Sequence, residues 1–102
     1  MTAGRTYTLR ISCTDGAKVA PHWHPTTENV TVVKGALLLG MGSKWDSEAM
    51  KEYPVGGFVY APAKMRHYAQ CKGDSILQVH GVGPFLINFV GPDDTAASKK
   101  MN

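Results

Sequence analysis

The sequence predicts a single all-β domain, a sandwich or barrel of short antiparallel strands. Runs rich in Val, Ile, Leu, Thr and Tyr recur along almost the whole chain, and Gly, Pro or Asp bounds each of them. Turn signals such as Asp15-Gly16 and Lys72-Gly73-Asp74 separate these runs. With 102 residues the chain can bury one core but not a second independent one. Many short strands at such spacing are typical of a sandwich or barrel.

The individual elements follow from the same pattern. The stretch 45–53, WDSEAMKEY, contains helix formers, with Asp46 or Ser47 available as the N-cap and Pro54 as a stop. We therefore expect one short helical insertion there. The tail 92–102 is polar and lacks periodicity, so we place the ordered core of the single domain 1–102 at about 6–91. The expected strands are 7–13, 19–24, 28–34, 35–40, 57–61, 67–71, 76–80 and 85–90.

Composition and charge exclude several classes of function. Apolar residues make up 43% of the chain and charged ones 19%, which is ordinary globular usage. The net charge of +3 comes from scattered basic residues, so we expect no nucleic-acid partner. No apolar run resembles a secretory signal or a membrane span. We therefore expect no membrane contact and a soluble, cytoplasmic protein, in which Cys13 and Cys71 are reduced thiols rather than a disulfide.

Four residues are candidates for a common site. His22 and His24 lie two apart in a strand-like stretch, so both imidazoles face one way while Trp23 faces the other. A tight turn then brings Glu28 back towards the pair. His67 follows a second turn and can lie on a neighbouring strand. Imidazoles combined with one carboxylate suit a divalent transition metal such as Fe, Mn, Zn, Ni or Cu.

The spacing of these residues resembles the two motifs of the cupin superfamily. The first motif, glycine, His-x-His, glutamate and glycine, is matched at every position, and the second, glycine, proline and histidine, is matched with two departures. Lys64 stands where the family has glycine, and Cys71 where it has asparagine. The matching residues are Gly16, His22, His24, Glu28 and Gly35 in the first motif and Gly56, Pro62 and His67 in the second.

The resemblance implies a cupin-type antiparallel β-barrel, of jelly-roll or double-stranded β-helix form. It also implies a metal site of three histidines and one glutamate, His22, His24, His67 and Glu28. An empty site, in which the polar cluster binds water or a ligand directly, is the alternative.

Residues beyond the four are predicted with open alternatives. Gln78 and His80 share one face of a strand. If that face is the interior, both are candidate catalytic residues, with His80 the better proton carrier. In the alternative they face solvent or hold only supporting hydrogen bonds. Trp45 is a candidate either for the anchor of a flap over the barrel or for a residue that fills a surface groove at a subunit contact. Met65, Tyr60, Phe58 and Leu38 are candidate cavity or core residues.

These features predict a metal-dependent enzyme that acts on a small molecule, of the dioxygenase, isomerase, decarboxylase or lyase type, as cupins do. The alternative is a non-catalytic module that binds a metal or ligand and passes a signal to another chain. Since isolated cupins commonly pair through edge strands, we also expect a homodimer, with the strand near Tyr7 exchanged between subunits.

Overall fold

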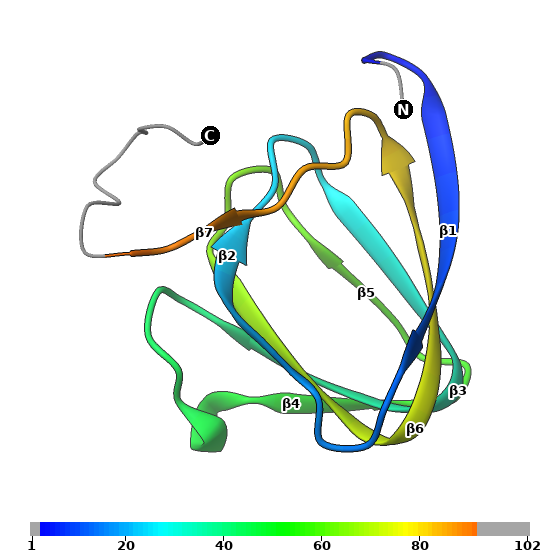
Figure 1. Cartoon of the computed structure of the whole chain (residues 1–102), viewed down its shortest axis with the longest axis vertical. Helices are drawn as coiled ribbons and strands as arrows, with labels where there is room; N and C mark the ends of the chain where they lie inside the picture. Colours follow the sequence, from blue (N-terminus) through cyan, green and yellow to red (C-terminus); the bar gives the residue numbers. More distant parts are fainter. Residues whose placement is uncertain (1–2, 92–102) are drawn as a thin grey trace.

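The structure is a computed structural model that describes residues 3–91, and it is almost entirely β. Seven strands and one short 3-10 turn follow one another along the chain (Figure 1). The polar tail predicted at 92–102 lies outside the described residues. The elements are β1 (Thr6–Cys13), β2 (Lys18–Trp23), β3 (Glu28–Met41), η1 (Ser47–Ala49), β4 (Lys51–Pro54), β5 (Phe58–Ala61), β6 (His67–Val82) and β7 (Asn88–Phe89).

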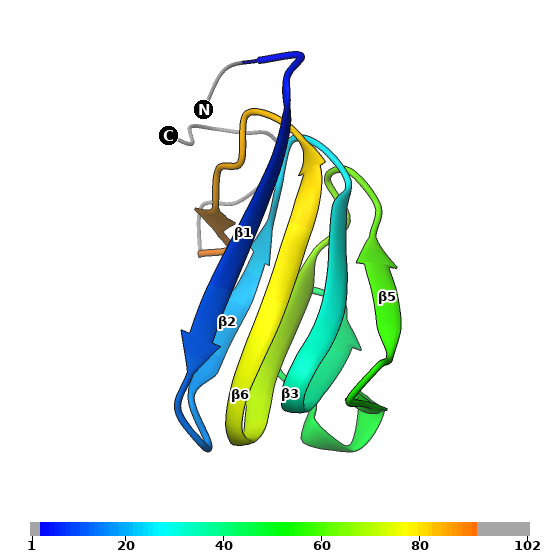
Figure 2. The same cartoon turned by 90° about the vertical axis from the view of Figure 1, so that its right-hand side faces the viewer.

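All seven strands belong to one antiparallel sheet, with β3 and β6 at its centre. The main path runs β4-β3-β6-β2-β7, while β1 pairs with β6 and β5 pairs with β3. Figure 2 shows β1 beside β6, β6 beside β3 and β3 beside β5. Among the described residues no pairing joins β4 to β7. The all-β antiparallel prediction is thus confirmed, but the sheet folds over into a sandwich-like form and does not close into a barrel.

The long strands β3 and β6 each combine two of the predicted strands. Register shifts between Val32 and Ala36 mark the bend in β3, and Gly35 has a φ of +74° there. A Cβ atom at Gly35 would collide with the side chain of Ser75. Gly35 therefore bends β3 at the position where the sequence predicted a strand end. The strand continues beyond the bend, since its ladder to β6 resumes at Ala36.

The core lies between the two halves of the folded sheet. Its buried cluster is formed by Tyr7, Val30, Val32, Leu37 and Val79. Strand alternation places Ala61 inside, with 3% of its surface exposed, and Val59 packs against the same cluster.

Three of the predicted cavity or core residues are exposed instead. Phe58 and Tyr60 are more than half exposed, and Met65 is also exposed. Phe58 and Tyr60 alternate along β5 with the inward residues, so their side chains lie on the outer face of the sheet. Leu38 is half-buried.

The predicted helical insertion is a single 3-10 turn. Asp46 caps it, since its carboxylate accepts a hydrogen bond of 3.0 Å from the backbone N–H of Glu48. The helix ends early because residues 51–54 pair with β3 as strand β4. The Trp45 ring packs against the Tyr68 ring with centroids 5.0 Å apart, so this tryptophan anchors the insertion to the sheet.

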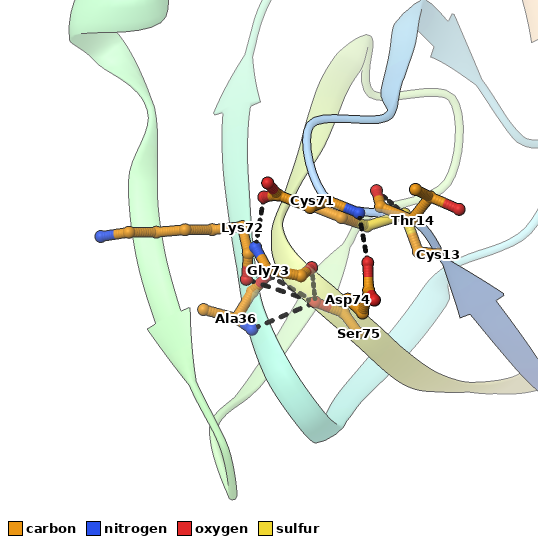
Figure 3. Close-up of a disulfide and its surroundings, with 9 residues drawn as sticks. Cys13, Thr14, Ala36, Cys71, Lys72, Gly73, Asp74 and Ser75 are labelled. Atoms are coloured by element: carbon orange, nitrogen blue, oxygen red, sulfur yellow. Dashed lines mark hydrogen bonds between the residues drawn. A yellow bond between two sulfur atoms is a disulfide. The ribbon is translucent and has the colours of Figure 1, made fainter.

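The prediction of two reduced thiols is wrong, because Cys13 and Cys71 form a disulfide (Figure 3). The two cysteines are 58 residues apart, so the sequence alone did not indicate that they pair. Cys13 lies opposite Ser75 in the β1–β6 ladder. The backbone N–H of Cys71 donates a hydrogen bond to the carbonyl oxygen of Ala17, which follows the β1–β2 turn. The two strands thereby bring the Cα atoms to 6.2 Å. Since disulfides persist in oxidising compartments, the predicted cytoplasmic location loses the support of reduced thiols and stays a prediction.

No helix within residues 3–91 has the length and apolar character needed to cross a bilayer. Strand β1, which was predicted to exchange between subunits, pairs along its whole length with β6 of the same chain. The predicted homodimer stays a prediction.

Candidate metal centre

Three histidines and one glutamate meet at one point inside the folded sheet. His22, His24, Glu28 and His67 each offer one nitrogen or oxygen atom, and these four atoms lie within 4.8 Å of one another. The histidines are almost completely buried, with at most 4% of each surface exposed. The convergence that the sequence predicted is present, and the group could hold a metal ion.

Local strand structure places each of the four side chains. His22 lies on β2 directly opposite His67, the first residue of β6, and their rings are 4.2 Å apart. His24 follows at the end of β2, and Trp23 between them faces the other way, under the guanidinium of Arg66 at 5.0 Å. Glu28 is the first residue of β3, so the turn after His24 returns its carboxylate to the pair.

Backbone carbonyl groups fix the orientation of all three imidazole rings. Each Nδ1 atom lies 2.7 to 2.9 Å from a carbonyl oxygen, that of Ala20, Leu86 or Met65 for His22, His24 and His67 respectively. A carbonyl oxygen only accepts hydrogen bonds, so Nδ1 must carry the proton in each ring. In the neutral rings every Nε2 atom therefore presents a lone pair, as metal-binding imidazoles do.

Glu28 supplies the negative charge of the cluster. Its Oε1 atom lies 3.2 Å from Nε2 of His24 and 3.2 Å from Nε2 of His67. The His24 Nε2 atom is buried and makes no directed hydrogen bond, although it lies this close to the carboxylate. Lone pairs on neutral rings facing a carboxylate repel one another unless a cation, either a proton or a metal ion, lies between them.

Burial and the negative charge of Glu28 together shift the pKa values of the clustered side chains. Desolvation lowers the pKa of His22 to about 4, so this ring stays neutral near neutrality. Burial also opposes protonation of His24, but the nearby carboxylate of Glu28 outweighs it and raises the pKa of His24. Burial raises the pKa of the Glu28 carboxyl, yet His24 and His67 overcome this and lower it to about 2.

Aromatic side chains that the sequence analysis did not assign surround the cluster. The Phe85 ring stacks on His24 with centroids 5.0 Å apart, and the Phe89 ring lies 5.9 Å from that of His22. Both belong to the segment after β6 that returns alongside β2. The only signal for these two residues was the apolar run at 85–90. It predicted a strand there, but not that the strand would lie beside β2 and the metal centre.

The structure does not bring Gln78 and His80 into the four-residue cluster. Val79 between them points into the core, so both neighbours lie on the outer face of β6. The Gln78 side chain accepts a hydrogen bond of 2.9 Å from Arg10 Nε, and the His80 ring lies against exposed Phe58 at 6.3 Å. This placement matches the alternative in which the pair faces outwards. Their catalytic role stays a prediction.

The two departures from the second cupin motif have structural explanations. Lys64 has a φ of +66°, a conformation that glycine adopts without strain, and its backbone N–H donates a 2.8 Å hydrogen bond to the carbonyl oxygen of His24. Cys71 is committed to the disulfide with Cys13. The turn that carries His67 therefore places a lysine, in this chain, in a conformation that favours glycine.

Comparison with known families agrees with this geometry. Residues 11–83 match the model of the cupin domain, so the chain belongs to the cupin family. No curated protein sequence matches the chain significantly.

Several solved structures share the fold. A conserved protein of unknown function from Streptococcus pyogenes is 15% identical with a TM-score of 0.67, over 83% of this chain and 70% of that one. A candidate acetylacetone dioxygenase from Methylibium petroleiphilum is 21% identical with a TM-score of 0.68, over 93% and 63%. An oxalate oxidase is 26% identical with a TM-score of 0.68, over 86% of this chain and half of the other. The chain thus spans less than two thirds of either oxidising relative.

Proposed function

We propose that this protein is a metal-dependent enzyme that acts on a small molecule bearing oxygen donors. One divalent transition metal would be held by the Nε2 atoms of His22, His24 and His67 and by the carboxylate of Glu28. Such an ion, when bound, supplies Lewis-acid or oxygen-activating chemistry.

One observation carries the proposal. All three Nδ1 atoms are engaged by backbone carbonyl groups, so three lone pairs and a carboxylate are directed at the same buried point. A structural cluster of buried polar groups would pair donors with acceptors. Here four acceptors converge, and the donor set of imidazole and carboxylate is the one that first-row transition metals prefer.

The protein's own residues would set the properties of the centre. The carbonyl groups hold the rings in a fixed tautomer and orientation, which keeps the ligands ready for the ion. Glu28 is 13% exposed at its side chain and is the ionised member of the set, so it can also accept a proton from a bound molecule. The Phe85 ring, which stacks on His24, would shield one side of the cluster from water.

The charge of the site supports the substrate class. Three neutral imidazoles and one carboxylate leave a net charge of about +1 around a divalent ion, so an anionic oxygen ligand completes the neutralisation. The names of two similar structures, a candidate acetylacetone dioxygenase and an oxalate oxidase, refer to small molecules that each carry at least two oxygen atoms. A molecule that binds through two oxygen atoms is therefore the substrate class we propose.

Elemental analysis of protein purified without added metal tests the site. We expect about one equivalent of a single transition metal in the wild type and a large loss in His24→Ala and His67→Ala. His80→Ala is the matched control, since it removes the histidine outside the cluster and should retain the metal. Equal metal content in all four proteins would contradict the proposed ligands.

Turnover separates the two predicted classes of protein. Oxygen uptake and substrate depletion would be followed with iron, manganese and zinc, using compounds such as β-dicarbonyls, α-hydroxy ketones and phenols. Turnover that disappears in His67→Ala supports the enzyme. A metal-loaded protein without turnover on any of them would favour the non-catalytic binding or sensor module. A loss of turnover in metal-loaded His80→Ala would support its predicted role in proton transfer.

The expected homodimer is part of the proposal. Sedimentation of the purified chain at several concentrations tests it, and a monomer at every concentration would remove it.

A further inference from the structure

The hydroxyl group of Tyr7 is buried and has no hydrogen-bond partner among the described residues. Tyr7 lies on β1, and its side chain is 9% exposed within the core cluster. Buried hydroxyl groups in folded proteins are nearly always hydrogen-bonded, because an unpaired donor loses its bonds to water without replacement. The Tyr7 hydroxyl is therefore available to a partner that the described part of the chain does not supply.

The position of Tyr7 relates this hydroxyl to the metal centre. Its ring packs against Phe85 with centroids 5.4 Å apart, and Phe85 in turn stacks on His24. On its other side the phenol lies over Gly81, its partner in the β1–β6 ladder. Tyr7 is thus one aromatic ring away from a candidate metal ligand.

Gly81 provides the room that the hydroxyl group occupies. A Cβ atom at this position would lie 3.2 Å from the Tyr7 hydroxyl oxygen and 2.8 Å from the carbonyl oxygen of Thr27. The same point in space is therefore close to the phenol and to the residue that precedes Glu28. Only glycine leaves the hydroxyl group and the start of β3 this near to each other.

The phenol is protonated and available as a donor at neutral pH. Burial raises the pKa of Tyr7, and the negative charge of Glu28 raises it further. A neutral phenol can donate one hydrogen bond to an oxygen atom that carries negative charge.

We propose that the Tyr7 hydroxyl is a ligand-binding group of the metal centre, which donates a hydrogen bond to an oxygen atom of the molecule bound there. This inference rests on the proposed function, since it requires a metal and an oxygen ligand. The ligand it fits is a singly charged molecule with two oxygen atoms, such as a hydroxamate or the enolate of a β-dicarbonyl, one of whose oxygen atoms faces β1. The alternative is a tyrosine that only fills the core.

Ligand binding to the cobalt-loaded protein distinguishes these two roles. Wild type, Tyr7→Phe and Tyr60→Phe would be loaded with Co²⁺ and titrated with acetohydroxamate, and the absorption bands of the metal would report occupancy. Tyr60 is the matched control because its ring is 55% exposed on the outer face of β5. Co²⁺ affinity and the melting temperature of each metal-free protein would be measured in parallel.

We expect Tyr7→Phe to bind acetohydroxamate about tenfold more weakly than wild type, as the loss of one hydrogen bond predicts. Co²⁺ affinity should stay within about twofold and the melting temperature should not fall, because the hydroxyl group has no protein partner to lose. Tyr60→Phe should match the wild type in every measurement.

Three results would overturn the inference in distinguishable ways. Equal acetohydroxamate affinity in wild type and Tyr7→Phe would make Tyr7 a packing residue while leaving the metal centre intact. Wild type that binds Co²⁺ but no acetohydroxamate would show that no oxygen ligand reaches the hydroxyl group. Wild type that binds no Co²⁺ would remove the proposed function and this inference together.

Discussion

The Nε2 atom of His67 lies 3.2 Å from the Oε1 atom of Glu28, although 39 residues separate them in the sequence. The contact exists because β2 holds His22 opposite His67, the first residue of β6, while the turn after His24 returns Glu28, the first residue of β3, to the same point. The same carboxylate oxygen is equally close to His24. Two strand ends and one turn thereby create a site that no local segment contains.

The ionisation of this cluster predicts how the stability of the metal-free protein depends on pH. The folded pKa of His22 is about 4, against 6.5 in the unfolded chain, so the unfolded chain binds more protons between these values. The free energy of unfolding should therefore fall as the pH decreases from about 6.5 to about 4. Glu28, with a folded pKa of about 2 against 4.5, extends the decrease to lower pH. His24 has the opposite sign, and its contribution is lost as the pH rises above 6.5 through its raised pKa.

Urea unfolding of the metal-free protein at several pH values between 7 and 3 measures this dependence. In His22→Gln the decrease between pH 6.5 and 4 should be shallower, since the buried imidazole is gone. A wild-type stability that does not change over this range would contradict the ionisation described for the cluster.

The disulfide predicts a large contribution to stability. Cys13 and Cys71 close a loop of 58 residues, for which the loss of chain entropy in the unfolded state corresponds to about 4 kcal/mol. The double variant Cys13→Ser, Cys71→Ser should be less stable by roughly this amount in urea unfolding. Its metal content should be unchanged, because Cys71 lies four residues along β6 from His67, about 13 Å in a strand. Equal stability of the oxidised and the double-variant protein would mean that the bridge adds nothing.

Gly40 predicts a steric effect in the sheet. A Cβ atom there would collide with the ring of Tyr68, which is 1% exposed and cannot move away freely. Gly40→Ala should lower the free energy of unfolding by about 1 to 3 kcal/mol, as overpacking does. Gly91→Ala is the matched control, since nothing lies within 4 Å of the added atom. Thermal unfolding that gives the same melting temperature for both variants would contradict the packing described.

Lys64 predicts a stabilising substitution. A residue with a side chain at a φ of +66° is strained by about 1 kcal/mol, and glycine relieves this strain. Lys64→Gly should raise the free energy of unfolding, by less than about 1 kcal/mol because glycine also makes the unfolded chain more flexible. Lys72→Gly, a change of the same residue type at an exposed strand position, should lower it. A decrease in both variants would mean that the turn before His67 does not require the left-handed conformation.

The sequence was sufficient for the features that depend on local alternation and spacing. His22 and His24 share a strand face at any register, and the turn to Glu28 is too short to lead elsewhere. The strand positions were predicted well for the same reason. The sequence could not show that Gly35 bends β3 without ending it, since a glycine at positive φ occurs both in turns and in bulges.

The features that were missed depend on contacts between distant strands. Either Val79 or the pair Gln78 and His80 must face the core, because they alternate along β6. The sequence could not show which, since both faces carry residues that a core or a surface can accept. The partnership of Cys13 with Cys71 depends on the pairing of β1 and β2 with β6. The position of Tyr7 beside Phe85 has the same origin, because the two residues belong to opposite ends of the described chain.

X-ray diffraction from a crystal of the zinc-loaded protein, recorded at the zinc absorption edge, tests the central claim most directly. The account predicts one strong anomalous peak about 2.0 to 2.1 Å from the Nε2 atoms of His22, His24 and His67 and about 2.0 to 2.2 Å from an oxygen of Glu28. The three Nδ1 atoms should remain hydrogen-bonded to their backbone carbonyl oxygens. A peak bound elsewhere, or rings turned so that Nδ1 faces the ion, would contradict it.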